Sequence, residues 1–165
     1  MERRGGAAGT LAAVLGVAAG CMLIIASTAR WYGPPNMALE PRGLGVFYVH
    51  RDELITTHPA GWAVLVTGVA VCLAFAVGAF YCRRTLGVIG AVSALVGFVV
   101  LLRSWLDPDS VLRESEARIG VNVFVDSSAA WGLYAGMAAS VVALICSAVV
   151  SVSGAAARSD SSQQV

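Results

Sequence analysis

The sequence predicts an all-α membrane protein, a four-transmembrane-helix bundle with a small extracytoplasmic β-sheet formed by the two outer loops. Apolar residues make up 58% of the 165-residue chain and charged residues only 13%, whereas a soluble domain carries about 25% charged residues. The apolar residues gather in four long runs separated by polar segments. The net charge of +1 gives no reason to expect a nucleic-acid partner.

Each apolar run is long enough to cross the ~30 Å hydrocarbon core of a bilayer as a helix. No Asp, Glu, Lys, Arg or His interrupts them, and they lack the alternation of barrel strands. We expect the four spans at residues 7–29, 60–81, 85–102 and 129–152.

An even number of spans puts both termini, residues 1–6 and 153–165, on one side together with the short turn 82–84. This side holds the paired arginines Arg3–Arg4 and Arg83–Arg84 beside span ends, and the positive-inside rule weights such charges. We therefore expect both termini in the cytoplasm, with residues 153–165 as a disordered tail. All basic residues are arginine, which suggests a GC-rich, actinobacterial genome and hence the plasma membrane.

The N-terminal run also resembles a secretory signal, because arginines precede it and small residues follow it. It is longer than the 7–15 apolar residues typical of a signal peptide, so we expect this span to be retained.

The long outer loops, 30–59 and 103–128, carry signals for secondary structure. Residues 45–50 and 54–57 are rich in β-formers on either side of a polar turn, which predicts a hairpin. In the second loop, Ser110–Arg118 predicts a short helix capped by Asp109 or Ser110. Valine at every second position of 121–126 predicts a strand that joins the hairpin to make one sheet.

The residues give no reason to expect a catalytic, cofactor or metal site. The two histidines, His50 and His58, lie in the first loop near Asp52 and Glu53, and solvated loop residues explain them more simply than ligands do. The four cysteines show no metal-binding spacing. A proton-coupled transporter usually has charged residues within its spans, and these spans have none.

Two groups of residues are candidates for structural roles. Small residues at helix spacing predict faces for close helix packing, within the bundle or against another subunit: Gly16, Gly20, Ala74, Gly78, Gly132, Gly136 and Ala139. Aromatic residues near the span ends are expected to anchor the chain at the membrane interface: Trp31, Tyr32, Trp62, Trp105 and Trp131.

The order of four spans, a long first outer loop with strand signals, a tight inner turn and a strand before span four resembles the claudin-like tetraspan arrangement. The Trp-Gly-Leu-Trp and paired-cysteine signature of claudins is missing, so no junction function is carried over. In size and layout the chain also resembles the tetraspan accessory subunits of mycobacterial Mce lipid importers, the lipid uptake coordinator B type.

The second resemblance implies a non-catalytic accessory or stabilising subunit whose partners are membrane lipids and the permease and periplasmic subunits of a lipid transporter. The alternatives are an accessory subunit of a respiratory complex and a small homo-oligomeric transporter.

Overall fold

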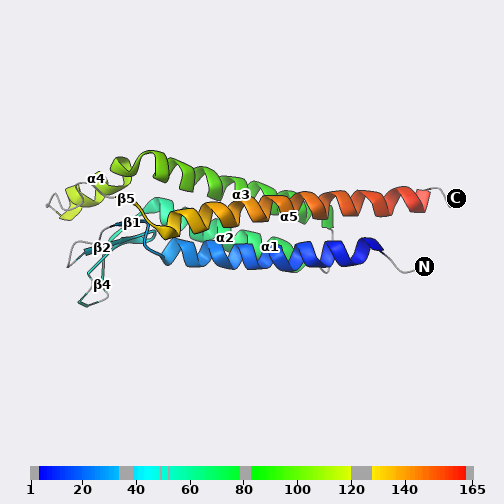
Figure 1. The fold of residues 1–165 in the computed structure, drawn as a ribbon, viewed down its shortest axis with the longest axis horizontal. Helices are drawn as coiled ribbons and strands as arrows, with labels where there is room; N and C mark the ends of the chain where they lie inside the picture. The colour runs from blue at the N-terminus through cyan, green and yellow to red at the C-terminus, as the bar shows by residue number, and fades with distance from the viewer. Residues whose placement is uncertain are drawn as a thin grey trace.

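The computed structural model describes residues 4–33, 39–48, 50–51, 53–78, 83–119 and 128–162. Within these residues the chain has four long helices: α1 (Arg4–Thr28), α2 (Pro59–Gly78), α3 (Arg83–Leu106) and α5 (Trp131–Ser162). They run side by side along the long axis of the molecule, with both chain ends at one end of the bundle (Figure 1). The opposite end carries the strands and the short helix α4 (Pro108–Ile119), which together we name the cap.

The four long helices each contain a candidate membrane span: Ala8–Thr28, Pro59–Gly78, Thr85–Leu106 and Trp131–Val152. Their mean hydropathy is 2.2 to 2.5, and only 28–39% of each span is buried inside the protein. Most of each apolar surface therefore faces outward, as expected for helices surrounded by lipid rather than water. The architecture is compatible with a multi-pass membrane protein.

The last helix is longer than expected. Helix α5 continues to Ser162 and includes residues 153–162, where the sequence analysis expects a disordered tail. The Gly154-Ala-Ala-Ala-Arg158 segment is rich in alanine, the residue of highest helix propensity. With no proline to end it, the helix extends beyond the apolar span.

The bundle is a closed ring of antiparallel neighbours. Helix α1 packs against α2 and α5, and α3 packs against the same two helices. Its interior is filled by fully buried aliphatic side chains, among them Leu23, Val64, Val71, Leu101 and Leu133.

The cap contains two small antiparallel sheets. Strands β2 (Leu39–Arg42), β3 (Gly45–Tyr48) and β4 (Glu53–Thr57) form a three-stranded sheet in that order, all from the first loop. The two-residue strands β1 (Tyr32–Gly33) and β5 (Ser128–Ala129) pair with each other and so connect the two loops. The predicted hairpin corresponds to β3 and β4.

The prediction of one sheet from both loops is only partly right. The described strands form two sheets, and the third strand beside the hairpin is β2 of the same loop. Pro41 argues against a strand when the sequence is considered alone. Proline is tolerated on an edge strand, however, because its nitrogen need not donate a ladder hydrogen bond there. The predicted strand 121–126 lies outside the described residues.

Helix α4 begins two residues earlier than predicted, at Pro108. Its cap is Asp107, whose carboxylate accepts a hydrogen bond from the Ser110 backbone N–H at 3.2 Å; Asp109 and Ser110, the predicted caps, lie inside the helix. Proline suits the first helical position because that position needs no N–H donor.

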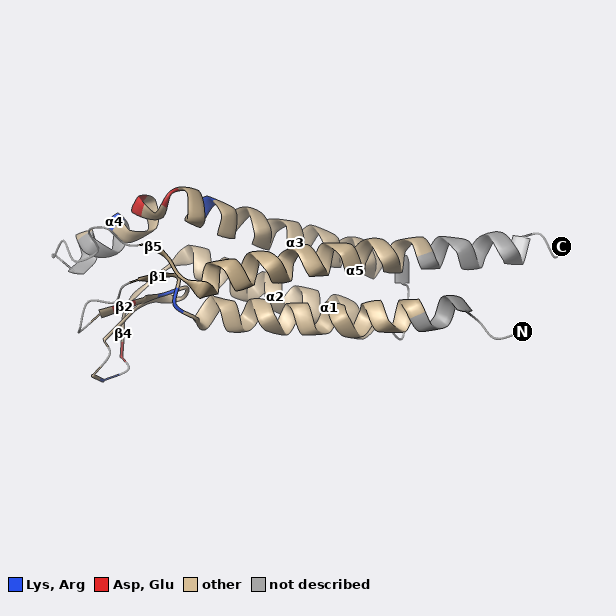
Figure 2. Ribbon diagram, viewed as in Figure 1, with Lys and Arg blue, Asp and Glu red and all other residues tan. Residues whose placement is uncertain are grey.

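The charged residues that Figure 2 colours lie at the cap, and the middle of the bundle has none. The bundle thus separates an apolar, lipid-compatible shaft from a polar cap.

Candidate docking cap

A short segment at the end of α1, residues 30–32, holds the cap to the bundle, and we name it the strap. On one side, the Trp31 backbone N–H donates to the Pro41 carbonyl of β2 at 3.0 Å. On the other side, the Arg30 carbonyl accepts from the Gly132 N–H of α5 at 3.1 Å. The first N–H groups of a helix have no partner within the helix, so the strap supplies a cap for α5.

Two predicted membrane anchors lie in the strap, and the prediction is wrong for both. Trp31 and Tyr32 are 0% and 1% exposed, so neither can contact lipid. The indole N–H of Trp31 donates to the Ala26 carbonyl at 2.8 Å, and the Tyr32 hydroxyl donates to the Ser104 carbonyl at 2.8 Å. Both acceptors lie in the last turn of a helix, where carbonyls lack helical partners. Burial raises the pKa of the Tyr32 hydroxyl, which stays a donor at physiological pH.

The other three predicted anchors remain on the surface. Trp62, Trp105 and Trp131 are 45%, 41% and 56% exposed, and each lies within the first or last turn of its helix beside the cap. The Trp105 indole N–H also approaches the Tyr134 hydroxyl at 3.4 Å. These amphipathic side chains are in position to contact lipid headgroups.

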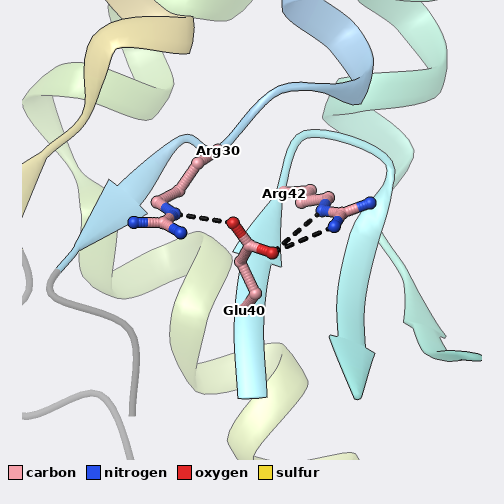
Figure 3. Close-up of polar contacts among 3 residues, drawn as sticks. All are labelled: Arg30, Glu40 and Arg42. Atoms are coloured by element: carbon pink, nitrogen blue, oxygen red, sulfur yellow. Dashed lines mark hydrogen bonds and ion pairs between the residues drawn. The ribbon is translucent and has the colours of Figure 1, made fainter. Parts of the chain in front are cut away.

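An ion-pair cluster braces the strap against β2 (Figure 3). One oxygen of Glu40 accepts from Arg30 Nε at 2.7 Å, and the other pairs with Arg42 Nη2 at 3.0 Å. Partial burial alone would raise the pKa of Glu40, but the hydrogen bonds from both arginines outweigh it and lower that pKa. The Arg42 guanidinium also lies 4.6 Å above the centre of the Phe47 ring, a cation–π contact. Sequence analysis missed this cluster because Arg30 lies 10 positions before Glu40 and meets it only when the strap packs beside β2.

The hairpin turn between β2 and β3 fits between two helices only because glycines meet there. A side chain on Gly43 would collide with the Ser27 carbonyl, and one on Gly61 of α2 would collide with the Gly43 backbone. The Gly43 N–H donates to the Ala29 carbonyl at 3.0 Å. The three-stranded sheet is therefore fixed to both α1 and α2.

Strand β4 presents apolar side chains to the outside. It is an edge strand of the three-stranded sheet, and its Leu54 and Ile55 are 38% and 44% exposed. Successive strand residues point to opposite faces, so each face of this edge carries one exposed aliphatic group. A firmly held edge strand is a common docking element for a partner's strand.

Within the described ranges, no three His, Cys, Asp or Glu side chains lie close enough to hold a metal ion. His50 is exposed and its ring lies 5.8 Å from that of Tyr48. His58 is buried at 3% exposure, and its backbone N–H donates to the Leu44 carbonyl at 2.8 Å. Asp52 lies outside the described residues. The structure thus separates the two histidines instead of joining them in a site.

The small residues of α1 and α2 pack against one another. Gly16 contacts the Phe75 ring, and Gly20 lies so close to α2 that an added Cβ would be 2.8 Å from the Cys72 backbone nitrogen. Ala74 is also buried, and an added Cβ on Gly90 of α3 would lie 3.7 Å from the Ala74 Cβ. Gly78, at the end of α2, faces Leu86 of α3 at an ordinary contact distance.

The small residues of α5 also face the inside. An added Cβ on Gly132 would be 2.5 Å from the Arg30 carbonyl oxygen, and one on Gly136 would be 2.8 Å from Leu101 Cδ1. Ala139 is 5% exposed. These residues close the ring between α5, α1 and α3, which leaves no free glycine face at Gly132 and Gly136 for another subunit.

Several hydroxyl groups inside the spans bond to carbonyls of their own helices. Thr67 donates to the Val64 carbonyl at 2.9 Å, and Ser140 donates to the Gly136 carbonyl at 3.0 Å. The buried Ser147 hydroxyl has no partner.

No protein-family model, no curated protein and no solved structure matches the chain. Its function is therefore inferred from the molecule's own geometry.

Proposed function

We propose that this chain is a non-catalytic accessory subunit that stabilises a larger cell-envelope membrane complex, with an Mce-type lipid importer as the favoured complex. In this proposal the protein lies in the plasma membrane of an actinobacterium, with both termini in the cytoplasm and the cap outside. The observation that carries the proposal is the firmly held cap with its exposed edge strand, β4.

The support comes from the contrast between how the cap is held and what it exposes. The strap, the Glu40 cluster and the turn at Gly43 fix the cap to all four long helices. Such rigidity lowers the entropy cost of docking, because few groups must be ordered on binding. Leu54 and Ile55 would then contact an extracytoplasmic part of the complex, while the apolar sides of the bundle lie beside its permease.

A pull-down of the tagged native protein in mild detergent, followed by mass spectrometry, tests the proposal. We expect Mce proteins, their permeases and an ATPase to accompany it. Cytochrome subunits would point to the respiratory alternative. Recovery of the protein alone as a defined oligomer would overturn the accessory role and direct attention to solute transport.

A matched pair of variants tests the docking surface itself. Leu54→Glu combined with Ile55→Glu should remove the partners, because docking would bury two carboxylates without ionic partners. Arg113→Glu also adds negative charge to the cap, but at a side chain of α4 that is 79% exposed, and should leave the partners in place. Equal partner recovery from both variants would exclude β4 as the contact.

A further inference from the structure

A cavity of about 200 Å³ lies between all four long helices, at the end of the bundle that holds both chain termini. It is distant from the cap and independent of the docking proposal. Every long helix contributes to its wall, as shown by Gly9 and Ala13 of α1, Phe75 and Gly78 of α2, Gly87 of α3 and Val150 of α5.

The wall is mostly apolar. Thr10 is the single residue in it with a polar side chain, and that residue has an interaction partner of its own. Engineered apolar cavities of about 150 Å³ stay free of water and accept benzene-sized molecules. A cavity of this size and lining therefore favours a hydrocarbon group over water or a polar solute.

The shape of the cavity follows from the size of its side chains. The Phe75 ring packs on Gly16 and is 3% exposed, so it closes the cavity toward the middle of the bundle. Beyond it, Ala13, Gly78 and Gly87 provide no side chain long enough to fill the space. Part of the boundary stays open to the outside, which allows a chain-like molecule to enter.

The position of the cavity identifies the kind of molecule. All residues that line it belong to the four candidate membrane spans, from Gly9 in the first to Val150 in the last. In a membrane, the acyl chains of the surrounding leaflet are therefore the apolar molecules nearest to its opening.

We propose that the cavity binds one acyl chain of a membrane phospholipid. The bound lipid fills the gap between the four helix ends and holds them together. The mechanism requires only burial of methylene groups in a preformed apolar space.

The test uses the full-length protein in vesicles of phosphatidylcholine that contain phosphatidylglycerol with a diazirine at the end of one acyl chain. After illumination, mass spectrometry locates the labelled residues. We expect label on the cavity wall, for example on Ala13 and Phe75. Label only on outward-facing residues such as Leu11 or Val66, which are 61% and 65% exposed, would overturn the proposal.

Two variants of α1 distinguish lipid bound in the cavity from lipid that contacts the outer side of the helix. Ala13→Phe places a ring in the cavity, whereas Ala18→Phe places the same ring on the exposed side of the helix. Excluding two methylenes corresponds to roughly tenfold weaker occupancy, so cavity labelling should fall about tenfold in Ala13→Phe and stay unchanged in Ala18→Phe. Equal labelling in the two variants would overturn the proposal.

A second variant keeps the test decisive. If Ala13→Phe does not give monodisperse protein, Val150→Phe fills the cavity from α5 instead. Unchanged labelling of the wall in Val150→Phe would overturn the proposal.

Discussion

The close approach of α1 and α2 makes a prediction in which two similar substitutions have opposite effects. In Gly20→Ala, the added Cβ would lie 2.8 Å from the Cys72 backbone nitrogen and 3.0 Å from the Gly68 carbonyl oxygen. Backbone atoms cannot rotate away, so the helices must separate. In Gly78→Ala, the nearest atom is Leu86 Cβ at 3.4 Å, and no separation is needed.

The sizes of two opposing effects determine whether each substitution stabilises or destabilises the bundle. Replacing a helical glycine by alanine favours the helix by about 1 kcal/mol at either position. Overpacking a tight contact costs about 1–3 kcal/mol, and only Gly20→Ala incurs this cost. Gly78→Ala should therefore be neutral or stabilising, Gly20→Ala neutral to destabilising, and the two variants should differ by about 1–3 kcal/mol.

The assay is thermal denaturation in detergent, with the monodisperse fraction measured by size-exclusion chromatography after heating. For a protein of this length, about 1 kcal/mol shifts the midpoint by roughly 2–4 °C, so Gly20→Ala should unfold several degrees below Gly78→Ala. A midpoint for Gly20→Ala equal to or above that of Gly78→Ala would refute the packing of α1 on α2.

Three other perturbations test the cap and the bundle. Tyr32→Phe leaves the buried Ser104 carbonyl without its donor and should cost about 1–3 kcal/mol; an unchanged thermal midpoint would contradict this contact. The pKa of Glu40 is lowered, so its ion pairs should contribute fully to the stability of the fold above about pH 4.5. This stabilisation should be lost as the pH falls through the lower pKa of the folded state. Tryptophan fluorescence during acid titration should report this loss of stability, and the same transition should be absent from Glu40→Gln. The Cys21 and Cys72 sulfurs lie 3.7 Å apart, so iodine should oxidise the two thiols to a disulfide and be reduced to iodide. Intact mass spectrometry should then show the loss of two hydrogens with two of the four thiols still free, and four free thiols after oxidation would argue against this geometry.

The long helices could be anticipated because their signal is strong and local. An uninterrupted apolar run of span length needs no knowledge of its neighbours. The hairpin 45–57 was also accessible, since β-formers flank a polar turn. In each case the residues that decide the structure are adjacent in the chain.

The cap contacts depend on residues that the sequence separates widely. Tyr32 reaches Ser104, 72 residues later, and Trp31 near a span end has the same local appearance as the exposed Trp131. Aromatic position relative to a span therefore predicts proximity to the membrane surface but not burial. The Glu40 cluster was missed because Arg30, 10 positions earlier, pairs with Glu40 only when the strap lies beside β2.

The strap also has a consequence for the order in which the protein is completed during synthesis. Its Arg30 and Trp31 carbonyls accept hydrogen bonds from Gly132 and Ala130 at the start of the last helix. Until that helix has been made, these carbonyls lack their partners, and the β1–β5 pairing cannot form. The cap is thus complete only after the final helix has been made. A nascent chain stalled before α5 would lack these contacts, and a partner that recognises the cap would meet a different surface.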